Sequence, residues 1–203
     1  MNGGQGMPYR HAMRTICLLA ALTLAAPALA HEAHGVAGGF VSGLTHPVYG
    51  WDHVVAMVAV GLWGAVLGPP ALWALPVVFP LVMAVGGAMG VAGLPLPQVE
   101  AGIALSGVVL GLLVALTVRA PLWIAGLVVG LFAVFHGHAH GTELPGAANP
   151  YAYAVGFVIG TGLLHLVGVG LGFVTRLPRG GLVLRAAGIG IAAVGGLFLA
   201  GLA

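Results

Sequence analysis

The stretch ALWALPVVFPLVMAVGGAMGV, residues 71–91, decides the fold, because it carries no charged residue over a length that can cross a bilayer as one helix. The rest of the chain has the same character. Hydrophobic residues make up 60% of the sequence, charged residues make up 5%, and lysine is absent. Such a chain cannot cover a solvated surface of ordinary size, so the sequence predicts an all-α integral membrane protein.

Six apolar segments of this kind follow one another, separated by glycine, proline or arginine. They lie at residues 51–67, 71–91, 99–118, 121–135 or slightly beyond, 151–174 and 182–202. At about 20 residues per span, the 203 residues leave no room for an added soluble domain. We therefore expect one membrane domain of six transmembrane helices over residues 31–203.

The first thirty residues have the pattern of a secretory signal. Arg10 and Arg14 precede an apolar run at residues 16–26, and Ala28-Leu29-Ala30 supplies the small residues of a cleavage site. We predict a signal peptide over residues 1–30, with His31 as the mature N-terminus. The alternative is an uncleaved first helix that acts as a signal anchor. Both readings place residue 31 outside the cytoplasm.

Counting six spans inward from that end gives a topology that agrees with the arginines. The four arginines beyond the signal, Arg119, Arg176, Arg179 and Arg185, then all fall on the cytoplasmic side. We expect a multi-pass protein of the bacterial cytoplasmic (inner) membrane with a periplasmic N-terminus, whose partner is the lipid bilayer. Six arginines against four carboxylates are too few for a nucleic-acid patch.

A helix break is expected just before the first full span. Pro47 removes a backbone donor and Gly50 adds backbone freedom, so residues 36–45 are predicted to form a half-helix or re-entrant piece. Such pieces line cavities at membrane depth. The alternative is an amphipathic stretch at the surface.

The segment HPVYGWDH, residues 46–53, is the first of two motifs that bring ligand-type side chains into this apolar chain. His46 and His53 would lie two turns apart, about 10 Å, on a continuous helix, so only the break can bring them to one ion. Asp52, the only aspartate of the chain, is either a site carboxylate or a helix cap alone.

The second motif is FHGHAHGTE, residues 135–143. If the helix continues, His136, His140 and Glu143 share one face, and His138 points elsewhere. The alternative is that the glycines unwind this end into a mobile loop that collects metal. Imidazole and carboxylate ligands suit nickel, cobalt, zinc or copper(II). The only cysteine, Cys17, lies in the signal, so no thiolate ligand is expected.

Two further histidines are candidates. His31 would stand at the free terminus after cleavage, either as part of a metal-collecting amine site or as a solvated tail. His165 lies near the middle of its span, where an ionisable group is costly and usually functional. It either relays ions or protons or bonds to a neighbouring helix.

Paired small residues predict close packing between helices. The spacing Gly-x-x-x-Gly occurs at 86/90, 107/111, 126/130 and 156/160, on four different spans, and such pairs let helix backbones approach in lipid.

The chain resembles the HupE/UreJ family of membrane proteins, through H-P-x-x-G-x-D-H from residue 46, F-H-G-x-A-H-G-x-E from residue 135, and GTGLLH at residues 160–165. The resemblance implies nickel supply to hydrogenase or urease maturation, or cobalt transport. It assigns metal capture to His46, Asp52, His53, His136, His140 and Glu143, and a weaker role to His165.

We therefore expect a secondary permease that imports a divalent cation, Ni²⁺ first and Co²⁺ next, from periplasm to cytoplasm, with no resident cofactor. No P-loop motif is present in the sequence. One alternative is a zinc-dependent intramembrane hydrolase with Asp52 or Glu143 as the base. The other is a membrane sensor or chaperone that binds metal without moving it.

Overall fold

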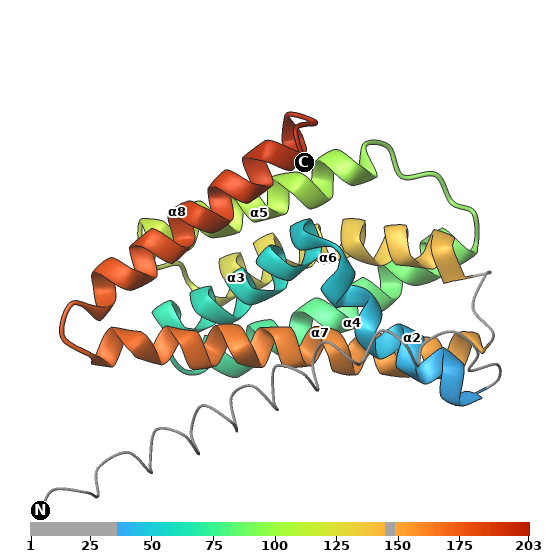
Figure 1. Cartoon of the computed structure of the whole chain (residues 1–203), viewed down its shortest axis with the longest axis horizontal. Helices are drawn as coiled ribbons and strands as arrows, with labels where there is room; N and C mark the ends of the chain where they lie inside the picture. Colours follow the sequence, from blue (N-terminus) through green and yellow to red (C-terminus); the bar gives the residue numbers. More distant parts are fainter. Residues whose placement is uncertain (1–35, 145–148) are drawn as a thin grey trace, which may run out of the picture. The chain divides into compact units, whose positions relative to one another are not determined.

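A computed structural model describes residues 36–144 and 149–203, and these residues form helices and no strand. The predicted signal peptide and His31 lie outside the described residues. The helices are α2 (Val36–Tyr49), α3 (Trp51–Leu67), α4 (Ala71–Val91), α5 (Val99–Ala115), α6 (Leu122–Glu143), α7 (Pro150–Gly172) and α8 (Gly180–Leu199), with a 3₁₀ turn, η3 (Phe173–Arg176), after α7 (Figure 1).

Each of the six predicted apolar segments corresponds to one helix, from α3 to α8. Four of them, α4, α6, α7 and α8, are long and apolar enough to cross a membrane, and the bent pair of α2 and α3 can form a fifth span. Helix α5, with 17 residues, is shorter. The chain is a multi-pass helical membrane protein, and the count of six spans stays a prediction.

The predicted break between α2 and α3 is present, but it lies at Gly50 alone. Pro47 remains inside α2, so the half-helix expected over residues 36–45 extends to Tyr49. Gly50 has an extended backbone, with φ −102° and ψ 113°, and the two helix axes turn by 85° around it. Pro47 lies two residues before the end of α2, so its missing donor affects only the last turn of that helix. An extended residue interrupts it.

Helix α3 is the centre of the described bundle. It packs against α4, α5, α7 and α8, and its side chains from Ala56 to Gly64 are almost all buried. Around it, the other helices form close pairs, α4 with α6, α5 with α8, and α2 with α7. In Figure 1, α5 and α8 lie side by side along one edge, and α3 lies between this pair and α7.

Glycine pairs allow these close contacts. A Cβ added at Gly156 or Gly160 of α7 would clash with backbone carbonyls of α2. Gly86 and Gly90 face carbonyls of α6 in the same way, Gly111 faces the backbone of α8, and a Cβ at Gly107 would lie 3.2 Å from the Gly195 Cα of α8. The predicted pair at Gly126 and Gly130 is different: within the described residues, Gly126 has no neighbour, and Gly130 meets only the Val82 methyls, at 3.7 Å or more. Three of the four predicted motifs are therefore helix contacts within this chain.

Candidate metal centre

The second motif places its histidines and its glycines on different faces of α6. Added Cβ atoms at Gly137 and Gly141 would clash with the carbonyl oxygens of Met83 and Gly87 on α4. The glycines thus let α6 lie close against α4, and the helix runs unbroken to Glu143. The alternative that they unwind this end into a mobile loop is wrong.

Three side chains meet where α2 approaches the end of α6, and we call them the outer group: His46, His140 and Glu143. Nε2 of His46 lies 3.1 Å from Oε2 of Glu143, and Nδ1 of His140 lies 3.5 Å from the same oxygen. The three ligand atoms all fall within 4.8 Å of one another. His140 is buried, His46 is partly buried and Glu143 is exposed, so the group lies at the edge of the protein.

The outer group has dimensions that suit a divalent cation. Nitrogen and oxygen ligands bind such ions at about 2.1 Å, so two ligands of one tetrahedral ion lie about 3.4 Å apart. The two contacts to Glu143, 3.1 and 3.5 Å, match this separation, and the two imidazole ligand atoms lie within 4.8 Å of each other. Two imidazoles and one carboxylate can therefore hold a transition-metal ion, with water at the remaining positions.

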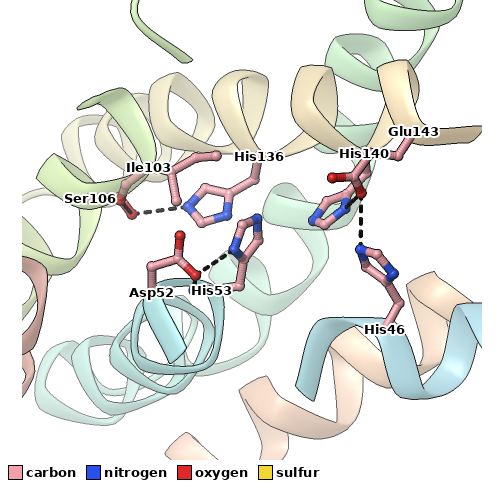
Figure 2. A network of polar contacts seen from close by, with 8 residues as sticks. All are labelled: His46, Asp52, His53, Ile103, Ser106, His136, His140 and Glu143. Carbon is pink, nitrogen blue, oxygen red and sulfur yellow. Dashed lines mark hydrogen bonds and ion pairs between the residues drawn. The ribbon is translucent and has the colours of Figure 1, made fainter. Parts of the chain in front are cut away.

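Deeper in the bundle, His53 and His136 form a second cluster, which we call the inner pair. Their ring centroids lie 4.8 Å apart. Asp52 Oδ1 lies 2.9 Å from Nδ1 of His53. It also accepts a hydrogen bond from the backbone N–H of His53, at 2.8 Å. Ser106 Oγ lies 3.0 Å from Nε2 of His136. Both histidines of the pair are thus held on one side by an oxygen atom (Figure 2).

His140 connects the two clusters. Its ring centroid is 5.0 Å from that of His46 and 4.7 Å from that of His53. Figure 2 shows the ring of His53 between those of His136 and His140. We predicted that the helix break brings His46 and His53 to one ion. In the structure the ring of His140 contacts the rings of both residues, and this arrangement gives the prediction no support.

His165 and His136 both pack against the ring of Phe79. The Phe79 ring is 5.5 Å from that of His136 and 5.2 Å from that of His165. His165 is fully buried, and neither of its ring nitrogens has a hydrogen-bond partner among the described residues. His138 points away from both clusters, as expected, and its Nε2 lies 2.7 Å from the Leu94 carbonyl.

Several imidazole nitrogens of the centre are buried without a partner in the described residues. They are Nε2 of His53, Nδ1 of His136 and Nε2 of His140, besides those of His165, whereas Nδ1 of His140 has only the 3.5 Å contact with Glu143. Buried polar atoms are almost always paired in proteins. Unpaired nitrogens on neighbouring rings therefore mark positions for a cation or for water.

The sequence reasoning missed Ser106 and Phe79. Ser106 is one of only two serines in the chain, and a single hydroxyl within an apolar span was the available signal. Phe79 gave no signal, because a phenylalanine in an apolar helix has the appearance of ordinary core packing.

Comparison with known proteins gives a family for this chain. The family model described as HupE / UreJ protein matches residues 19–198. A curated relative, protein HupE of Rhizobium leguminosarum bv. viciae, is 47% identical over 184 residues, which cover 90% of this chain and 95% of the relative. No solved structure matches the chain.

Proposed function

The chain belongs to the HupE/UreJ family, and from this membership and the outer group we propose that it is a secondary permease for a divalent transition-metal cation. The family is associated with nickel and cobalt uptake for hydrogenase or urease. Ni²⁺ is the first expected cargo and Co²⁺ the next. The direction is from the periplasm to the cytoplasm, in the bacterial cytoplasmic membrane.

The single observation that carries this proposal is the line of imidazoles that begins at the outer group. Neighbouring rings from His46 to His140, His53 and His136 follow one another at 4.7 to 5.0 Å. Nickel, cobalt and zinc all accept imidazole and carboxylate ligands. Weak sites in close succession let an ion enter, move on and leave, which one tight chelating site does not.

The membrane potential supplies enough energy for import. Each positive charge that moves inward gains about 2.3 kcal/mol per 100 mV, so a divalent ion gains about 4.6 kcal/mol. This free energy corresponds to an accumulation of about 10³-fold. The proposed permease therefore needs no ATP.

The zinc hydrolase is not favoured. Such an enzyme needs a carboxylate that is free to activate a metal-bound water. Both carboxylates of the centre already contact imidazoles. Asp52 contacts the imidazole of His53, and Glu143 contacts the imidazoles of His46 and His140.

The proposal is tested by radiolabelled nickel uptake in cells that express the wild type or Asp52→Asn, with unlabelled cobalt, zinc and copper as competitors. We expect uptake by the wild type and its loss in the variant at equal membrane abundance. The order of competition ranks the metals. His138→Ala serves as the matched control, because this histidine lies on the same helix but bonds to Leu94.

Transport by purified protein in liposomes with an imposed inside-negative potential separates a permease from a sensor. A permease fills the vesicles with nickel. Binding without accumulation would overturn the permease and leave the sensor or chaperone.

A further inference from the structure

The hydrogen bonds around the inner pair determine which nitrogen of each ring is free. Asp52 lies in the first turn of α3, where the helix dipole favours an ionised carboxylate. A carboxylate only accepts hydrogen bonds, so Nδ1 of His53 must donate to Oδ1 of Asp52 at 2.9 Å. In the neutral ring Nε2 then carries the lone pair, and it is buried without a partner among the described residues.

The same reasoning applies to His136 through Ser106. The Ser106 hydroxyl donates its single proton to the carbonyl of Ile103, at 2.6 Å. Toward Nε2 of His136, 3.0 Å away, its oxygen must therefore act as the acceptor. Nε2 of His136 carries the proton, and the lone pair lies on Nδ1, which is also buried and unpaired in the described part of the chain.

Two buried lone pairs on neighbouring rings are unfavourable without a partner between them. The ring centroids are 4.8 Å apart and the ring planes lie at 88°. Leaving a buried acceptor unpaired costs its desolvation free energy, and His136 is fully buried. A cation that binds both nitrogens removes this cost. A hydrogen-bond donor is not available from either ring, because each ring proton is already used.

We propose that Ser106 is a positioning residue of the metal centre: it keeps Nδ1 of His136 free, so that this atom and Nε2 of His53 can bind the divalent cation as an inner site separate from the outer group. The inference rests on the proposed function for its cargo. The ion reaches the inner site from the outer group through His140, whose ring lies 4.7 Å from that of His53. Two imidazoles with water at the remaining positions make a site that is weak enough to release the ion.

The test measures nickel binding to the purified full chain in a His46→Ala background, which removes one ligand of the outer group. Equilibrium dialysis against Ni²⁺ should show residual binding in this variant. Adding Ser106→Ala should weaken that binding at least about tenfold, and adding His136→Ala should remove it. Ser106→Thr keeps the hydroxyl and should restore it, whereas His138→Ala should change nothing.

A second readout separates positioning from folding. Nitrogen-15 NMR of labelled histidine in lipid reports which ring nitrogen carries the proton. We expect the Nε2–H form of His136 in the wild type and in Ser106→Thr, and its loss or mixing in Ser106→Ala. A variant that only misfolds would change the spectra of the other histidines too.

The inference is overturned if His46→Ala alone abolishes nickel binding, or if Ser106→Ala binds nickel as tightly as its background and keeps the Nε2–H form. Its failure differs from a failure of the proposed function. If wild-type liposomes accumulate nickel and Ser106→Ala liposomes do so equally well, the permease stands and the inner site falls. If neither accumulates nickel but binding follows Ser106, the inner site stands and the permease falls.

Discussion

Glu143 and His46 form a contact between α6 and α2, two helices that pack mainly against other helices. Oε2 of Glu143, at the end of α6, lies 3.1 Å from Nε2 of His46 on α2, whereas α2 packs mainly on α7 and α6 mainly on α4. The contact depends on the turn at Gly50, which sets α2 at 85° to α3. An ion in the outer group would therefore link the short helix α2 to the rest of the bundle.

Loss of an outer ligand should lower the affinity for the ion. We expect His46→Ala and Glu143→Gln each to raise the nickel concentration for half-maximal uptake at least about tenfold, since changes around metal sites typically cost 10–100-fold. Uptake rates over a series of nickel concentrations measure this change. His138→Ala, whose side chain contacts Leu94 instead, should behave as the wild type. Equal loss in all three variants would point to a folding defect.

Acid should compete with the ion. Histidine binds a metal through a neutral ring nitrogen, so metal binding releases protons, and the ordinary pKa of imidazole is about 6.5. As the pH falls, protons occupy the nitrogens and the apparent affinity declines. We expect nickel uptake by liposomes at constant membrane potential to fall as the pH is lowered, and excess nickel to restore it. A fall that excess nickel does not reverse would contradict competition between protons and the ion at the histidines.

Close packing of α4 on α6 should depend on Gly86. A Cβ there would clash with the carbonyl of Val134, whereas Gly126 has no neighbour within 4 Å among the described residues. We expect Gly86→Ala to destabilise the fold by about 1–3 kcal/mol and Gly126→Ala to be neutral or slightly stabilising. The melting temperature of the purified protein in detergent measures both. A drop of equal size in Gly126→Ala would show that this packing is not the cause.

The helices and the ligand residues could be predicted from local pattern, because length, hydropathy and helical spacing are properties of neighbouring residues. The continuous helix through Gly137 and Gly141 depends instead on α4, which the sequence around residue 140 does not reveal. The same holds for Ser106, which reaches His136 across 30 residues. Pro47 was expected to share in the break, but α2 continues past it to Tyr49.

His165 should affect movement of the ion more than its capture. Its ring packs against Phe79, at 5.2 Å, and the same phenylalanine contacts His136 of the inner pair. Both nitrogens of the ring are buried without a hydrogen-bond partner among the described residues. We expect His165→Gln, which keeps a polar side chain of similar size, to lower liposome uptake at least about tenfold while nickel binding by dialysis stays unchanged. If uptake is also unchanged, His165 serves packing alone.

Gly50 should be needed for the inner pair as well as for the helix break. A Cβ at this position would lie 2.8 Å from Oδ1 of Asp52 and 3.1 Å from Nδ1 of His53, so it would displace the bond that holds the His53 ring. The backbone angles of Gly50, φ −102° and ψ 113°, are accessible to alanine, and the fold should therefore survive. We expect Gly50→Ala to weaken nickel uptake about tenfold with little change in melting temperature. Gly162→Ala, on α7 with no neighbour within 4 Å among the described residues, is the matched control. Wild-type uptake by Gly50→Ala would show that the position of His53 does not limit transport.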